Sequence, residues 1–322
     1  MITVTPYPDR AAWLAARRGT IGGTTAAAIL GVSPWSSPWS VYAREVLGQP
    51  DDGPGDEIAQ RGLELEPVAL ARWARAGRLP AGCEPLDSAG DIVTVRRADL
   101  PGWLASPDAL VVDSATREIV GGVEVKTVSR SDLGRFWSDD DPEPAWVRDI
   151  DGRDVHPDDD GGHVPPGWLV QMLVYIEITG AKWWDLNVLG PHIDQTAILR
   201  IWRDEATQRA LVERCNAWWS THIEGRTPPP VDGSEACARA LLRDGPRSGR
   251  HRMERIDDPE LDTWAAAYVE LGQRAAAAND ARAEARNHLI AVIGDDVARV
   301  MTTGHTITID KRGSVKVTAR KA

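Results

Sequence analysis

Glu124 and Lys126 lie two residues apart in the stretch GGVEVKTVS, with a valine at each of positions 123 and 125. Side chains alternate along a β-strand, so the carboxylate and the ammonium share one face while the two valines share the other. A valine face is easily buried, which leaves the two charged groups presented together. The pattern indicates either a solvated pair on an edge strand or the floor of a catalytic site.

Asp108, in the stretch LASPDALVV, is followed by the turn DSATRE and then by the strand of Glu124. If the two strands pair antiparallel, Asp108 lies next to Glu124. Two carboxylates at such a corner suit Mg²⁺ or Mn²⁺, because both ions prefer oxygen ligands. A bound metal would lower the pKa of a water and stabilise charge on a phosphate. Lys126 would hold the attacking water or neutralise the transition state.

Two residues on predicted helices extend this group. Glu66, in RGLELEPVALARW, would add a carboxylate, and Gln171, in GWLVQMLVYIEITG, would orient water or metal. Each has an ordinary alternative, since Glu66 before a proline is also a first-turn helix acid and Gln171 a polar residue on a half-buried helix. The order along the chain favours catalysis: a helix acid, a strand aspartate, an E-x-K strand and a helix glutamine.

The elements that position these residues follow from hydrophobic periodicity and from Gly and Pro punctuation. Alternating segments predict a strand meander over residues 91–128 and a strand pair in KWWDLNVLG and TAILRIWR. The predicted helices cover residues 9–20, an alanine-rich segment with Thr24 or Thr25 as N-cap, residues 38–47, a long segment ending at Gly77, a buried segment ending at Gly180, and residues 204–224. The sequence therefore predicts an α/β fold with a mixed central sheet flanked by helices.

We expect residues 1–230 to form the catalytic domain, with an acidic loop at 130–166. Residues 231–256 are interpreted as a basic linker. Residues 257–322 are expected to add a helix, with Trp264, Tyr268 and Leu271 on one stripe, and a β-hairpin.

Composition narrows the class of protein. The formal charge of −11 argues against a protein that coats nucleic acid non-specifically. Three widely spaced cysteines indicate neither a disulfide framework nor a four-cysteine metal site. The N-terminal stretch MITVTPYPDR has no signal-peptide core and no apolar run is long enough to span a bilayer, so we expect a cytoplasmic protein with no membrane partner.

Taken together, five stretches resemble the YqaJ-like viral recombinase family, which is similar to phage lambda exonuclease within the PD-(D/E)XK nuclease superfamily. The stretches, which span about residues 10–230, are RRGTIGGTTAAAILGVSPWSSPWSVY, RGLELEPVALARW, LASPDALVV, GGVEVKTVS and VPPGWLVQMLVYIEITGAKWWDLNVL. The resemblance implies a nuclease core of the PD-(D/E)XK type.

By this resemblance, the metal would be held by Asp108, Glu124, the Val125 carbonyl and Glu66, the helix carboxylate, with Lys126 as the catalytic lysine. Relatives often carry further glutamines on the helix of Gln171, where this chain has Leu173 and Tyr175. Gln171 alone would then fill that role.

The resemblance also implies a 5′-phosphate pocket made by Arg17, Thr24 and Ser106, although Arg18 is adjacent and a one-residue slip is an open alternative. A hydroxyl near free N–H groups at a helix start, with an arginine close by, is an anion site in kind. An ordinary capped core helix is the structural alternative.

The implied activity is a Mg²⁺-dependent (or Mn²⁺-dependent) 5′–3′ exonuclease on linear double-stranded DNA, in a bacterial host cell, that leaves 3′ single strands for an annealing protein. The resemblance also implies a ring-shaped homotrimer. Two alternatives stay open: a repair or defence-related nuclease of the same superfamily, and a non-catalytic protein that binds DNA ends.

Overall fold

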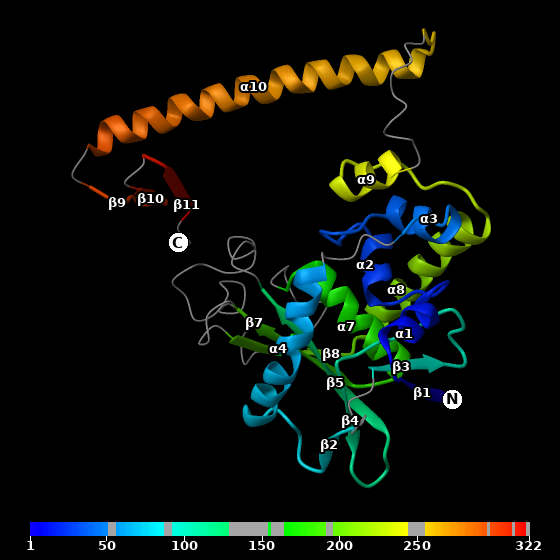
Figure 1. Cartoon of the computed structure of the whole chain (residues 1–322). Helices are drawn as coiled ribbons and strands as arrows, with labels where there is room; N and C mark the ends of the chain where they lie inside the picture. Colours follow the sequence, from blue (N-terminus) through cyan, green and yellow to red (C-terminus); the bar gives the residue numbers. More distant parts are fainter. Residues whose placement is uncertain are drawn as a thin grey trace. The chain divides into compact units, whose positions relative to one another are not determined.

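The computed structural model divides the chain into two compact units, residues 1–250 and 251–322 (Figure 1). The structure describes residues 1–50, 56–86, 92–128, 154–155, 164–190, 196–243, 255–294, 297–310 and 313–319. Most of the predicted acidic loop at 130–166 lies outside the described residues. Among the described helices, none is both long and apolar enough to cross a membrane.

The first unit is built on a mixed sheet with the strand order β2-β4-β5-β7-β8-β6. Its strands are β2 (Cys83–Pro85), β4 (Ala109–Asp113), β5 (Ile119–Thr127), β6 (Asp154–Val155), β7 (Trp183–Leu189) and β8 (Thr196–Trp202). β5 pairs antiparallel with β4 and parallel with β7. A parallel pair needs a crossover, and α7 (Pro166–Thr179) lies in the connection. The predicted mixed sheet flanked by helices is confirmed.

Helices cover both faces of this sheet. α4 (Asp56–Arg75) covers the face that contains Val111, Val123 and Trp183, with which Trp73 of α4 forms a buried cluster. α7 covers the other face and is buried from Gln171 to Thr179, because its apolar residues surround the whole helix. Both faces of β5 are therefore covered, and the valine face is buried as predicted.

The N-terminal elements complete the first unit (Figure 1). They are β1 (Ile2–Tyr7), which pairs antiparallel with β3 (Ile92–Arg97), and the helices α1 (Arg10–Arg17), α2 (Gly23–Ile29) and α3 (Pro38–Val46). Asp9 caps α1 by accepting a hydrogen bond from the Ala12 N–H at 2.8 Å, and Ser37 and Ser40 form a capping box on α3.

The prediction that Thr24 or Thr25 caps the alanine-rich helix is wrong, because Gly22 is the N-cap of α2. Glycines are required here by close packing against α7. A Cβ on Gly23 would lie 2.6 Å from Cγ of Gln171. Thr24 therefore lies inside the first turn, where its hydroxyl is available to other partners.

The predicted linker at 231–256 contains a helix, α9 (Glu235–Arg243), which follows α8 (Glu205–Trp219) and a π-helical turn at Ser220–Glu224. α9 packs against α3, and Gln49 Nε2, just beyond α3, donates a hydrogen bond to the Ala240 carbonyl at 3.1 Å. Ala236, Cys237 and Ala240 are buried. Part of the segment interpreted as a basic linker is therefore folded, because its small residues form a buried helix face.

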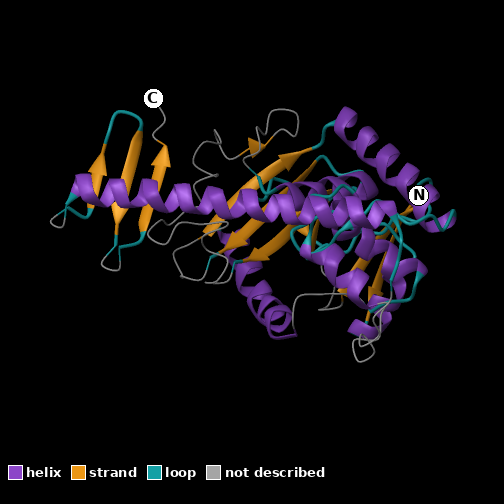
Figure 2. Ribbon diagram, turned by 90° about the horizontal axis from the view of Figure 1, so that it is seen from above, coloured by secondary structure: helices purple, strands orange, loops and turns teal. Residues whose placement is uncertain are grey.

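The second unit contains α10 (Pro259–Ile293) and three antiparallel strands, β9 (Arg299–Met301), β10 (His305–Ile309) and β11 (Val315–Ala319). The predicted hairpin corresponds to β10 and β11, and β9 adds a third strand on the other side of β10. Figure 2 shows these three strands as a separate small sheet.

Candidate active site

The register of β4 and β5 brings the predicted acidic residues together. Ala109 lies opposite Val123, so Asp108, just before β4, lies beside the following residues of β5. The Val125 N–H donates a hydrogen bond to Asp108 Oδ2 at 2.6 Å. Asp108 and Glu124 are thus neighbours, as the antiparallel arrangement predicts.

Glu124 is a buried carboxylate, with an exposed fraction of 4%. Its Oε1 accepts hydrogen bonds from Lys126 Nζ and from Gln171 Nε2, each at 2.5 Å. Its Oε2 is buried and has no hydrogen-bond partner among the described residues. One oxygen is doubly satisfied while the other is left open, an arrangement that costs free energy unless something binds there.

Glu66 on α4 is also part of this group, because the charge of Glu124 acts on its carboxyl. Burial, followed by the charge of Glu124, raises the pKa of Glu66. Burial also raises the pKa of Asp108 well above its usual range, with further contributions from Glu124 and Glu66 that Lys126 opposes. Perturbed carboxylates of this kind gather at functional sites, although structural ion pairs also perturb pKa values.

The residues fit a hard divalent cation with few protein ligands. Such a cation would bind the unpaired Glu124 Oε2. It would also offset the repulsion among Asp108, Glu124 and Glu66. Within the described ranges, no three His, Cys, Asp or Glu side chains are gathered as a metal site. Asp108 and Glu124 are candidate side-chain ligands, and Mg²⁺ is commonly held by one or two carboxylates while keeping several waters. Glu66 lies on the helix that covers the opposite face and acts on this pair through its charge.

Gln171 is held by a residue that the sequence analysis did not assign to the site. Its Nε2 also donates to the Tyr175 hydroxyl at 2.7 Å, and that hydroxyl donates to the Ser106 carbonyl at 3.1 Å. Burial raises the pKa of Tyr175 well above its usual range, so the phenol stays protonated and can donate. The available signal was the spacing of four residues, which puts Gln171 and Tyr175 on one face of α7.

The three predicted phosphate-binding residues lie in a second group, linked by Trp13. Arg17 Nη2 donates to Thr24 Oγ1 at 3.2 Å, and the Trp13 indole N–H donates to Ser106 Oγ at 2.6 Å. The Arg17 guanidinium lies over the Trp13 ring, 4.5 Å from its centroid. Trp13 precedes Arg17 by one turn of α1, a spacing that could have indicated its role.

Ser106 joins the two groups. Its carbonyl accepts from Tyr175, which is bound to Gln171, and its hydroxyl accepts from Trp13. The positive charge of Arg17 acts on the pKa of Tyr175 and partly offsets the rise caused by burial. A basic and hydroxyl-bearing group therefore adjoins the carboxylate group.

Asp108 and the E-x-K strand thus meet on one side of the mixed sheet, where α7 places Gln171 against Glu124. Residues 12–182, more than half of the chain, match the YqaJ-like viral recombinase domain, and the chain belongs to that family. Membership places the protein among DNA exonucleases, which are hydrolases, and nucleases of this family typically use divalent metals.

Three solved structures, of two exonucleases, are similar to this chain. The alkaline exonuclease LHK-Exo from Laribacter hongkongensis is 20% identical, with a TM-score of 0.46 over 73% of this chain and 100% of that one; a complex of LHK-Exo with dAMP gives the same values. The phage related exonuclease from Haemophilus somnus 129PT is 13% identical, with a TM-score of 0.37 over 69% of this chain and 92% of that one. The comparison with curated proteins found no match. The roles of individual residues therefore depend on the geometry of this chain.

Proposed function

We propose that the protein is a Mg²⁺-dependent exonuclease that degrades linear double-stranded DNA from its 5′ ends in the cytoplasm of a bacterial host, with Mn²⁺ as an alternative ion. The observation that carries this proposal is the state of Glu124. Lys126 and Gln171 occupy one oxygen, and the other is buried with no hydrogen-bond partner among the described residues. Asp108 lies beside the same strand, where it accepts a hydrogen bond from the Val125 N–H. This is a prepared ligand pair for a cation rather than a solvated surface pair.

In this proposal, Asp108, Glu124 and the Val125 carbonyl hold the metal. When bound, the ion would activate a water and stabilise negative charge on the scissile phosphate. Lys126 is held next to the site by its ion pair with Glu124 and donates to the attacking water or to a phosphate oxygen. Gln171 fixes the rotation of the Glu124 carboxylate so that Oε2 is the oxygen left for the metal.

The 5′ polarity depends on the group of Arg17, Thr24 and Ser106. A guanidinium beside two hydroxyl groups can bind a terminal phosphate through several charge-assisted hydrogen bonds. Because Ser106 lies two residues before Asp108, a phosphate bound there would place the first phosphodiester bonds near the carboxylates. Recognition of the end and hydrolysis would then be coupled.

The product of such a reaction is a duplex with a 3′ single strand. The family resemblance supports an annealing protein as the partner that receives this strand, and a ring of three chains around the DNA. Both are proposals that copurification and mass measurement would test.

The activity can be tested on linear and closed-circular duplex DNA with Mg²⁺, Mn²⁺ or EDTA, using separate substrates labelled at the 5′ or the 3′ end. We expect early release of the 5′ label, intact circles and no reaction in EDTA. Cutting of closed circles would contradict an exonuclease. Tight binding of ends without cleavage in either metal would instead indicate a non-catalytic end-binding protein.

A further inference from the structure

The long helix α10 has an apolar seam that repeats every seven residues. Alternating spacings of three and four residues along the helix define ten positions, and nine of them are apolar or aromatic. The ten positions are Leu261, Trp264, Tyr268, Leu271, Ala275, Ala278, Arg282, Ala285, Leu289 and Val292. Apolar residues sustained at this spacing over more than four heptads are typical of a coiled-coil helix.

This seam is exposed within the second unit. The exposed fractions are 69% for Trp264, 83% for Tyr268, 60% for Leu271 and 86% for Val292. Aromatic and leucine side chains exposed along one continuous line mark an interaction surface, whereas isolated ones do not.

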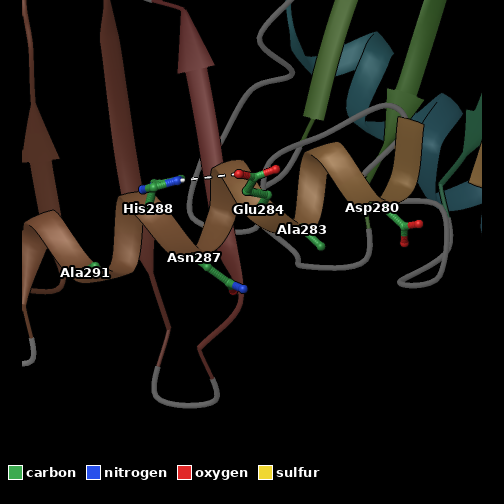
Figure 3. A pocket seen from close by; sticks show the side chains of 6 residues that line it. All are labelled: Asp280, Ala283, Glu284, Asn287, His288 and Ala291. Atoms are coloured by element: carbon green, nitrogen blue, oxygen red, sulfur yellow. Dashed lines mark ion pairs between the residues drawn. The ribbon is translucent and has the colours of Figure 1, made fainter. Parts of the chain in front are cut away.

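Polar side chains gather on a part of α10 outside the seam. Figure 3 shows the side chains around a shallow hollow there, where Asp280, Glu284, Asn287 and His288 lie together with Ala283 and Ala291. Glu284 and His288 are paired at 3.9 Å, one turn apart. The seam is the line of apolar residues that runs along the length of α10.

The length of the seam indicates which partner fits. A helix of 35 residues is about 52 Å long, and a strict seven-residue repeat faces its partner throughout only when two helices supercoil together. The next longest helix in the described ranges is α4, with 20 residues. A second copy of α10 offers a seam of the same length and spacing. Two strips about 52 Å long and about 10 Å wide give roughly 1,000 Å², the lower limit for a specific interface.

Arg282 decides the orientation. In a parallel pair, the two Arg282 side chains would meet in one layer of the seam and repel each other. In a fully overlapping antiparallel pair, Arg282 meets the partner's Leu271, and the two arginines are about 16 Å apart along the axis, beyond the screening length of about 8 Å. The same overlap pairs Leu261 with the partner's Val292 and Trp264 with the partner's Leu289.

We propose that α10 is a self-association element that pairs antiparallel with α10 of a second copy of the chain. A two-fold pair makes the number of chains even, whatever the nuclease units do. If those units do not associate, the assembly has two chains of 35.1 kDa each. If they form a ring of three, α10 joins two rings.

The test measures the mass of the full chain by light scattering, beside two variants that each introduce one glutamate. Leu289→Glu places the charge in the seam, opposite the partner's Trp264 and away from its Arg282, and Gln273→Glu places it outside the seam. We expect an even number of chains for the wild type, half that mass for Leu289→Glu and no change for Gln273→Glu. An odd number of chains, or equal masses for the wild type and Leu289→Glu, would overturn the proposal.

Oxidative cross-linking tests the orientation in a Cys83→Ser background, since Cys215 and Cys237 are buried. Leu261→Cys combined with Val292→Cys should give covalent dimers, and Leu261→Cys alone should not. Efficient cross-linking of the single variant would show a parallel pair and reject the antiparallel arrangement. Neither residue belongs to the proposed active site, so nuclease activity serves as a control for folding.

Discussion

Gln171 Nε2 lies 2.5 Å from Glu124 Oε1, although the two residues come from a helix and a strand that are 47 positions apart in the sequence. Because of this contact, Oε1 of Glu124 is hydrogen-bonded, whereas its Oε2 has no hydrogen-bond partner among the described residues. Tyr175, one turn along α7, in turn holds Gln171. The helix therefore orients the acid of the strand, and a cation would complete the arrangement.

The first prediction concerns the charge of this acid. Glu124→Gln keeps the shape of the side chain but removes the charge, and Asp108→Asn does the same for the second ligand. We expect each to lower the cleavage rate by at least about 100-fold, the scale on which a preorganised electrostatic group acts. Lys126→Ala should have a similar effect. The measurement is the initial rate on end-labelled duplex.

Glu118→Gln is the matched control, because Glu118 is exposed one residue before β5 and outside the carboxylate group. It should cleave at the wild-type rate. Circular dichroism must show that every variant is folded. A folded Glu124→Gln protein with near wild-type activity would remove Glu124 from the mechanism.

The second prediction concerns metal binding without turnover. The pKa of Asp108 is raised by burial and by its carboxylate neighbours, so the ionised pair is destabilising until a cation binds. Mg²⁺ at 100 times its Kd should stabilise the wild type by about 2.7 kcal/mol, and EDTA should reverse this. Asp108→Asn should be at least as stable as the wild type without metal and should gain little from Mg²⁺. Thermal unfolding with and without Mg²⁺ measures both effects, and an equal gain in the variant would contradict the site.

The sequence predicts the pairing of Asp108 with Glu124 because both depend on local rules. The alternation of β5 fixes which side chains share a face, and a short turn forces β4 and β5 to pair antiparallel. Gly121 and Gly122 leave the space that Trp183 and Trp184 of β7 fill by packing directly on them.

The features that the sequence analysis missed depend on contacts between distant segments. Thr24 looks like an N-cap, but the helix starts at Gly22 because α2 approaches the backbone of α7 closely at Gly23. The role of Trp13 depends on Ser106, 93 residues away. Such partners are chosen by tertiary packing, which periodicity along a single segment does not report.

The third prediction compares two glycines. A Cβ on Gly122 would lie 2.2 Å from a ring carbon of Trp184, a side chain that is fully buried. Gly122→Ala should therefore destabilise the protein by about 1–3 kcal/mol, as overpacking of a core does. Gly62, inside α4, has only Thr127 Oγ1 at 3.9 Å from its added Cβ. Gly62→Ala should stabilise the protein by about 0.5–1 kcal/mol, because alanine favours the helix.

Urea unfolding of the two variants measures this difference in the free energy of unfolding. The signs should be opposite even though the chemical change is the same. If Gly122→Ala were neutral, the close packing of Trp184 on β5 would be wrong.

The fourth prediction concerns the 5′-phosphate. Arg17 donates to Thr24 and lies over the Trp13 ring, whereas the adjacent Arg18 is exposed. Arg17→Ala should therefore lower the rate of initiation on 5′-phosphorylated duplex by about 10-fold or more, since a charge-assisted hydrogen bond contributes about 1.5–3 kcal/mol. Arg18→Ala removes the same charge next to the pocket and should have a much smaller effect.

The wild type should also initiate more slowly on 5′-hydroxyl ends, and Arg17→Ala should largely abolish the difference between the two ends. This double comparison separates phosphate recognition from a general loss of DNA affinity, which would slow both substrates equally. Trp13→Phe keeps the ring under Arg17 but removes the hydrogen bond to Ser106, so we expect it to raise the KM for phosphorylated ends with little change in kcat. Equal wild-type rates on both ends would exclude the pocket from the mechanism and leave the carboxylate site unaffected.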